Sequence, residues 1–373
     1  MSLTECLSAL SLHDSAARLW LVIEALPIAL IVVDRDGRII LANSESAKLF
    51  RYEEGALLGR GVDLLVPAES RPLHHLHVQR FFDAGVARKM GVGRRVQAED
   101  GQGRTFPVEI SVTPVETDEG PLAVAAIVDV ADQRRIESEL TTAQFVQRAM
   151  LPDPHPHFDG CDIFGVSKPA QLTGGDFFDF VALPDQRFAI AVGDASGHGF
   201  AAALVTAATR SYLRALARSE HSISKIVAIA NHLLQRELTD GRFVTLFYAK
   251  LDPDHKRLQF TAAGHSAYLF SSQGELKQRL NSTGPALGWF EDSKFPSQTV
   301  EIERRDIMVV TTDGIEEAMD LDGELFGRGR VQDVVREHAS ACSSEIVQAL
   351  FNAVRKFRVA QQDDATVVVV KFG

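Results

Sequence analysis

The sequence predicts an α+β chain in which two domains are joined by a charged helix. The 373 residues exceed what one ordinary hydrophobic core accommodates. Strand-type apolar runs alternate with helical patterns on both sides of a charged helical segment. We expect an N-terminal helix over 1–18, a first domain over 19–132, a connector helix over 133–151 and a second domain over 152–373.

Composition and charge argue against several classes of protein. The net charge of −11 disfavours a nucleic-acid partner. The most apolar early stretch, 19–33, is short and contains Glu24 and Pro27, so it predicts neither a membrane span nor a secretory signal. The three cysteines lie far apart and form no disulfide or metal-binding pattern. We therefore expect a cytoplasmic protein without a membrane partner.

The first domain begins with a predicted hairpin. Residues 28–33 form an apolar run typical of a strand, Asp34 to Gly37 supply turn residues, and 38–42 predict the returning strand. Short helical patterns follow over 44–84. Three more strands are predicted near 92–98, 105–115 and 122–130, and Asp100 to Gly103 predict the turn between the first two of these.

The connector helix carries a short seam of apolar residues. The spacing alternates between four and three residues, as in a coiled coil, with one polar interruption at Gln147. The seam residues are Ile136, Leu140, Ala143, Gln147 and Met150. A helix packed on its own domain and a dimerising or signal-carrying connector both agree with this pattern. The proline-rich residues 152–156 end the helix.

The second domain alternates strands with two long helices near 199–219 and 223–238. The helix after Gly199 is apolar almost all round, through Ala201, Leu204, Val205 and Leu213, which predicts burial against a sheet. The final strand, 365–372, is rich in β-branched residues, which predicts a position buried on both faces.

Carboxylates recur at the predicted strand edges of the second domain. Asp176 follows two glycines, Asp194 and Asp313 each follow an apolar strand, and Asp363 and Asp364 precede the last strand. Turn chemistry explains one such motif but not four. None of the motifs contains an Arg or Lys partner, and uncompensated buried carboxylates are costly. Divalent cations are the remaining compensation, and oxygen donors suit Mg²⁺ or Mn²⁺.

The second half of the chain resembles the PPM-type protein phosphatases, in their SpoIIE/RsbU-like branch, from about Gln144 to Phe372. Several motifs carry the resemblance in the family's order. They are Gly174-Gly-Asp-Phe-Phe-Asp179, Asp194-Ala-Ser-Gly-His-Gly199, Phe243-Val-Thr-Leu-Phe247, Ala263-Gly-His265, Gly284-Pro-Ala-Leu-Gly288, Thr312-Asp-Gly314 and Asp363-Asp-Ala-Thr366. The resemblance implies an α-β-β-α sandwich and a serine/threonine phosphatase that uses two Mn²⁺ or Mg²⁺ ions to activate a water.

The resemblance also implies roles for individual residues. Asp194 would bridge the two ions, the Ala195 carbonyl would add a ligand, Asp313 and Asp363 would complete one shell, and Asp176 would hold the second ion. Asp176 and Asp194 are therefore the expected catalytic residues, with Asp364 behind them. His198 does not match the general acid of eukaryotic relatives, and Lys168 does not match their phosphate-binding arginine. The implied substrate is a phosphorylated signalling protein of the anti-sigma-factor-antagonist type.

Residues 18–132 resemble a PAS sensor domain, which implies a small-molecule or cofactor site and a homodimer. Leu26 to Asp34 and Asp100 to Pro107 carry this resemblance. His74, Arg80 and Arg94 further resemble the haem-binding PAS of FixL-type oxygen sensors, with His74 as the axial ligand. PAS domains without haem share this pattern, so a surface histidine stays an open alternative.

Two other functions remain open from sequence. One is a catalytically inactive signalling scaffold. The other is a nucleotide cyclase, although Phe177 and Phe178 depart from the cyclase signature G-G-D-E-F. Under the phosphatase interpretation, we expect the PAS signal to change the connector helix and, through it, the metal site.

Overall fold

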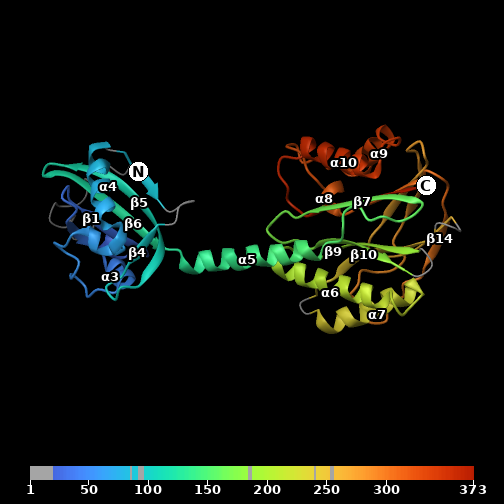
Figure 1. Cartoon of the computed structure of the whole chain (residues 1–373), viewed down its shortest axis with the longest axis horizontal. Coiled ribbons are helices and arrows are strands. Elements are labelled where there is room, and N and C mark those ends of the chain that lie inside the picture. Colours follow the sequence, from blue (N-terminus) through green and yellow to red (C-terminus); the bar gives the residue numbers. More distant parts are fainter. Residues whose placement is uncertain (1–19, 85, 91–95, 184–186, 239–240, 253–255) are drawn as a thin grey trace, which may run out of the picture. The chain divides into compact units, whose positions relative to one another are not determined.

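The computed structural model describes residues 20–84, 86–90, 96–183, 187–238, 241–252 and 256–373, and it divides into two compact units that meet between Ser138 and Glu139 (Figure 1). The predicted helix over 1–18 and the predicted haem contact Arg94 lie outside the described residues.

The N-terminal unit is a mixed α+β module built on a six-stranded antiparallel sheet. Its strand order is β2-β1-β6-β5-β3, and β4 pairs with β5. The strands are β1 (Ala29–Val33), β2 (Ile39–Ala42), β3 (Arg88–Met90), β4 (Gln97–Glu99), β5 (Thr105–Thr117) and β6 (Gly120–Asp129). The helices are α3 (Ser44–Phe50), α4 (Arg71–Ala84) and the short 3₁₀ turns η1 (Val62–Leu65) and η2 (Ala68–Ser70).

Both predicted hairpins of this unit are confirmed. Val32 pairs with Leu41 across the first, and Gln97 pairs with Pro107 across the second. The Asp100 carboxylate fixes the second turn, because its Oδ1 accepts hydrogen bonds from the Gln102 and Arg104 amides.

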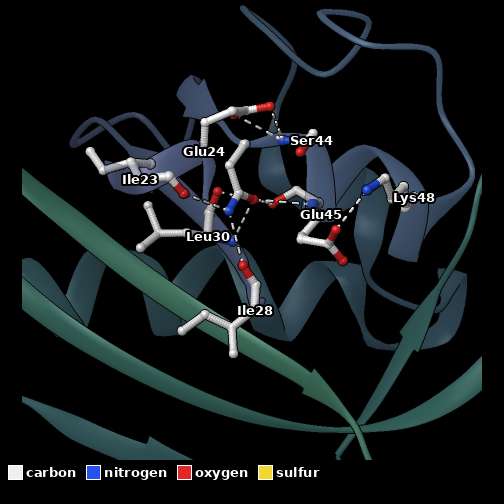
Figure 2. Close-up of polar contacts among 9 residues, drawn as sticks. Ile23, Glu24, Ile28, Leu30, Ser44, Glu45 and Lys48 are labelled. Carbon is white, nitrogen blue, oxygen red and sulfur yellow. Dashed lines mark hydrogen bonds and ion pairs between the residues drawn. The ribbon is translucent and has the colours of Figure 1, made fainter. Parts of the chain in front are cut away.

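A buried asparagine ties the first hairpin to helix α3. Asn43 is 1% exposed, and its Oδ1 accepts from the amides of Leu30 (2.9 Å) and Ser46 (3.1 Å). Its Nδ2 donates to the carbonyls of Ile28 and Ile23, so the whole side-chain amide is satisfied. Figure 2 shows these contacts, together with the nearby bonds from Ser44 to Glu24 and from Lys48 to Glu45.

Helix α5 (Ala131–Met150) contains the unit boundary. Ile136 of the predicted seam is 51% exposed, whereas Leu140, Ala143 and Met150 are half-buried. No helix within the described ranges is long and apolar enough to cross a membrane.

The C-terminal unit is a sandwich of two five-stranded antiparallel sheets with helices on both outer faces, as the resemblance implied (Figure 1). The first sheet has the order β14-β11-β10-β9-β8, and the second has the order β13-β12-β15-β16-β7. Between them lies a core to which both sheets contribute, with Phe178 and Phe247 from the first and Met308 and Val368 from the second.

The elements of the C-terminal unit have the following bounds. The first sheet contains β8 (Asp176–Ala182), β9 (Phe188–Ala195), β10 (Val244–Asp252), β11 (Arg257–Ala263) and β14 (Gln298–Glu301). The second contains β7 (Cys161–Lys168), β12 (Ala267–Phe270), β13 (Leu276–Leu280), β15 (Ile307–Thr311) and β16 (Ala365–Phe372). The helices are α6 (Phe200–Leu216), α7 (Ile223–Glu237), α8 (Asp313–Glu316), α9 (Gly327–Glu337) and α10 (Ser343–Phe357).

Both sequence predictions about burial are confirmed. Strand β16 is buried on both faces, with Val368 and Val370 in the inter-sheet core and Val367 and Val369 under the helices. Helix α6 packs on the first sheet, as its apolar residues predicted, with Ala202 and Leu213 buried, while Leu204 lies on its other face and is 55% exposed. The helix forms the outer layer, so only one face contacts the sheet.

Candidate metal centre

The predicted acidic residues lie at one edge of the sandwich, where strands of both sheets end. Asp176 begins β8 and Asp194 lies near the end of β9, and the two are direct cross-strand partners. In the second sheet, Asp313 follows β15 and Asp364 precedes β16, and these two strands are neighbours.

Hydrogen bonds connect the two sheets at this edge. Thr312 Oγ1 donates to Asp176 Oδ2 (2.7 Å) across the sandwich. The Gly175 amide donates to Asp364 Oδ2 (2.5 Å), and the Ala170 amide donates to Asp364 Oδ1 (2.7 Å). Asp364 therefore positions the loop that leads to Asp176, in agreement with its expected place behind the ligands.

The electrostatic environment shows that these carboxylates act on one another. Burial, followed by the charges of Asp313, Asp363 and Asp364, raises the pKa of Asp194 to about 8. Partial desolvation, followed by the charge of Asp363, raises the pKa of Asp313 to about 6. Burial and the charge of Asp194 raise the pKa of Asp176 well above its usual value.

The local structure fits oxygen-coordinated divalent ions in several respects. Asp176 is 4% exposed, and its Oδ1 has no hydrogen-bond partner among the described residues. Gly175 leaves room beside the expected ligands, since a β-carbon there would lie 2.6 Å from the Ala195 carbonyl oxygen and 3.2 Å from Asp194 Oδ1. None of the predicted ligands forms an ion pair with Lys or Arg in the described part of the chain.

The side chains alone do not form a finished shell. Within the described ranges, no group of three or more His, Cys, Asp or Glu side chains is arranged so that it could hold a metal ion. Asp313 and Asp363 are exposed at the mouth of the site, while Asp176 is buried. Backbone and water oxygens would have to complete the coordination, as Mg²⁺ commonly requires.

Sequence reasoning missed the contact that Gln147 makes. Its Nε2 donates to the Gly174 carbonyl (2.7 Å), and its Oε1 accepts from the Gly174 amide (3.2 Å). Gly174 lies two residues before Asp176, so the last turn of α5 touches the metal-site loop. The only sequence signal was a polar residue at an apolar seam position.

Asp179, in the same motif as Asp176, has a different role. It is 2% exposed and is paired with Arg214 (Nη2 to Oδ1, 2.7 Å) and Arg210 (Nε to Oδ2, 3.1 Å), both from α6. The sequence motif around Asp179 contains no Arg or Lys, because the arginine partners of Asp179 lie more than thirty residues away in the sequence. This cluster stabilises the packing of α6 on β8.

The histidines near the site serve as structural contacts in this structure. His198 is exposed, and its Nδ1 lies 3.4 Å from Gln171 Nε2. His265 is 8% exposed, and its Nδ1 lies 3.1 Å from Thr245 Oγ1. Burial lowers the pKa of His265 to about 4, so the imidazole is neutral at pH 7. Lys168 rests its Nζ 4.2 Å from the centre of the Phe351 ring.

In the N-terminal unit, His74 is half-buried and its Nδ1 lies 2.5 Å from Asp63 Oδ1. Arg80 is exposed on the same helix, α4. A carboxylate at Nδ1 orients a histidine whose other nitrogen binds a metal, so this pair is compatible with the predicted axial ligand.

Comparisons with known proteins match both units. A family model described as stage II sporulation protein E (SpoIIE) matches residues 184–373, and one described as a PAS fold matches residues 23–135. Phosphoserine phosphatase RsbU of Bacillus subtilis is 27% identical over 241 residues, which cover 64% of this chain and 71% of RsbU. Sensor protein FixL of Bradyrhizobium diazoefficiens is 25% identical over 123 residues, which cover 33% of this chain and 24% of FixL. The solved SiaA-PP2C domain of Pseudomonas aeruginosa aligns with a TM-score of 0.56 and 25% identity, covering 65% of this chain and all of that domain.

Proposed function

Because the chain belongs to the SpoIIE family and joins a PAS domain to a PPM-type protein serine/threonine phosphatase domain, we propose that it hydrolyses phosphoserine or phosphothreonine on a bacterial signalling protein with two divalent ions. One observation carries the metal-dependent part of this proposal. Asp176 and Asp194, from one sheet, meet Asp313 and Asp364, from the other, at a single edge of the sandwich.

The proposed ligands are Asp176, Asp194, the Ala195 carbonyl, Asp313 and Asp363. When bound, two Mn²⁺ or Mg²⁺ ions would lower the pKa of a water molecule and neutralise the phosphoryl oxygens. Thr312 orients Asp176 by donating to its Oδ2, which leaves Oδ1 directed to a ligand. Asp364 fixes the Gly175 backbone, so the spacing between Asp176 and Ala195 is set before a substrate arrives.

The substrate class follows from the relatives. RsbU carries the name phosphoserine phosphatase, and a phosphorylated anti-sigma-factor antagonist is the proposed substrate of this chain. A metal-activated water requires no side-chain nucleophile. The Ser196 hydroxyl is already engaged, because its Oγ accepts a hydrogen bond from the Phe243 amide (2.9 Å). A homodimer and a cytoplasmic location remain predictions from the sequence.

We propose that the PAS domain regulates the phosphatase through α5. Gln147 holds both polar groups of the Gly174 backbone, and the next residue, Gly175, is held by Asp364. Any rotation or shift of α5 would therefore be transmitted to the loop that leads to Asp176. The signal state of the PAS domain would change activity by altering this contact.

A haem in the PAS domain is a second proposal, supported by the hydrogen bond between Asp63 and His74 Nδ1. His74 would bind the iron through Nε2. Purified protein reconstituted with haem should show a haem absorption band that is lost in His74→Ala. Identical spectra for both proteins would refute the proposal.

The phosphatase proposal is tested by Mn²⁺-dependent phosphate release from serine-phosphorylated casein by the full chain. We expect release that stops with EDTA and falls at least ~1000-fold in Asp194→Ala. Release equal in the two proteins would refute the assigned site. No release from the wild type would favour the inactive scaffold, and pyrophosphate release from a nucleoside triphosphate would favour a cyclase.

A further inference from the structure

Three aromatic side chains lie next to the loop that follows Asp194. Phe243, Trp289 and Phe290 form what we call the aromatic ledge. The ring centres of Phe243 and Trp289 are 4.8 Å apart, and those of Trp289 and Phe290 are 6.3 Å apart. Trp289 is 50% exposed and Phe290 is 63% exposed. Adjacent exposed aromatic residues of this size are typical of interaction surfaces.

The aromatic ledge is joined directly to the loop that follows Asp194. The Ser196 amide donates to the Phe243 carbonyl (2.9 Å), and the Phe243 amide donates to Ser196 Oγ (2.9 Å). The next residue, Val244, exchanges two backbone hydrogen bonds with Leu287 (2.9 and 2.8 Å). The ledge is thus held to the rim of the metal site by main-chain contacts.

A buried asparagine fixes the segment that carries Trp289 and Phe290. Asn231 of α7 is fully buried, and its Oδ1 accepts from the Gly288 amide (2.8 Å), while its Nδ2 donates to the Phe290 carbonyl (2.9 Å). Gly288 has φ of +87°, and a β-carbon there would lie 2.7 Å from Leu238 Cδ1. The fold therefore uses a buried amide and a left-handed glycine to hold two aromatic rings in solvent.

An arginine next to the aromatic ledge in the sequence lies close to the loop that follows Asp194. Arg242 precedes Phe243, and its Nη1 is 3.7 Å from the position that a β-carbon on Gly197 would occupy. Arg242 forms no ion pair with any described residue. Gly197 follows the expected bridging ligand Asp194 by three residues, and a guanidinium beside it without an ion-pair partner among the described residues complements a phosphorylated side chain.

We propose that the aromatic ledge is the docking surface for the phosphorylated protein substrate, with Arg242 facing its phosphoryl charge. This proposal rests on the proposed phosphatase function. Trp and Arg are over-represented among the residues that dominate binding energy, and a preformed surface loses little entropy when a partner binds. Phe243 of the aromatic ledge is hydrogen-bonded to Ser196, two residues after Asp194. A protein bound on the ledge would therefore lie beside the expected metal ligands, which favours the phosphorylated substrate over other binding partners.

The test compares two substrates of very different size. The full chain with Mn²⁺ is assayed on serine-phosphorylated casein and on p-nitrophenyl phosphate, a small substrate that brings no protein surface to the aromatic ledge. For Trp289→Ala/Phe290→Ala we expect kcat/KM on phosphocasein to fall at least ~10-fold more than on p-nitrophenyl phosphate, mainly through KM. Leu276→Ala, a 39% exposed residue on the edge strand β13, is the control and should keep the wild-type ratio.

The single change Phe290→Ala removes a mostly exposed ring without touching the packing of Trp289 on Phe243, and it should lower the ratio about threefold. Equal effects on both substrates in both variants would overturn the docking proposal alone. Absence of phosphate release from either substrate by the wild type would overturn the proposed function and the docking proposal together.

Discussion

Asp176 and Asp194 face each other as cross-strand partners on β8 and β9, and the charge of Asp194, together with burial, raises the pKa of Asp176 well above its usual value. Carboxylates directly opposite each other destabilise a sheet unless a cation compensates them. Their pairing therefore links the stability of the fold to pH and to metal occupancy, and this link is measurable.

The metal-free chain should lose stability as pH rises. The folded-state pKa of Asp194 is raised to about 8 from an unfolded value of 3.8, and that of Asp313 is raised to about 6. Between pH 3.8 and about pH 8 the folded state binds more protons than the unfolded state. The free energy of unfolding therefore falls as pH rises through this range and levels off above about pH 8. In EDTA, we expect the thermal midpoint to be about 5 °C lower at pH 8 than at pH 5.5.

The control for this measurement is Asp194→Asn, which removes one of the titrating groups and should make the profile less steep. Excess Mn²⁺ should reverse the slope for the wild type, because the ions bind the deprotonated carboxylates. A metal-free midpoint that rises from pH 5.5 to pH 8 would show that these carboxylates are not crowded.

Gly175→Ala should disable the site through its added methyl group. The new β-carbon would lie 2.6 Å from the Ala195 carbonyl, a backbone atom that cannot move without shifting the end of β9. We expect phosphate release to fall at least ~100-fold. Gly329→Ala meets no atom within 4 Å and should leave activity unchanged. Normal activity in Gly175→Ala would mean that this spacing is unimportant.

Gln147→Ala should weaken catalysis although the residue is no metal ligand. It removes both hydrogen bonds to Gly174, so the loop before Asp176 loses its contact with α5. We expect a ~10-fold lower kcat and a higher Mn²⁺ concentration for half-maximal activity. Gln144→Ala, on the same helix, is the matched control. If both variants behave like the wild type, α5 does not position the site.

Arg214→Ala should affect stability more than activity. It leaves the Asp179 carboxylate, 2% exposed, with Arg210 as its remaining partner. Loss of one partner from a buried ion pair costs about 3 kcal/mol, which urea denaturation can measure. Arg218→Ala, at an exposed position after α6, should cost little. If Arg214→Ala is as stable as the wild type, the ion pairs of Asp179 contribute no more to stability than exposed surface pairs do.

The strand positions were predictable because hydrophobic patterning records burial. The β-branched run of β16 and the turn residues at Asp100 to Gly103 both predicted what the structure shows. The acid positions at strand ends were also visible, since Asp194 and Asp313 directly follow apolar runs. Their proximity could be expected only if the strands were neighbours.

Long-range polar partners could not be predicted from local patterns. Gln147 and Gly174 are 27 residues apart, and Asp179 and Arg214 are 35 apart, so no spacing rule connects them. The exposed face of α6 was missed for a related reason. Periodicity shows which residues are apolar, but the layer order decides which of them meet a sheet, and Leu204 does not.

Manganese binding by the 373-residue chain at pH 8, measured by titration calorimetry, would show directly whether the carboxylates of the two sheets share ions. If acids from both sheets hold a shared pair of ions, the wild type should bind two Mn²⁺ per chain. Asp194→Ala should lose at least one of them, with the remaining affinity reduced at least ~100-fold. Equal stoichiometry and affinity in the two proteins would show that Asp194 holds neither ion.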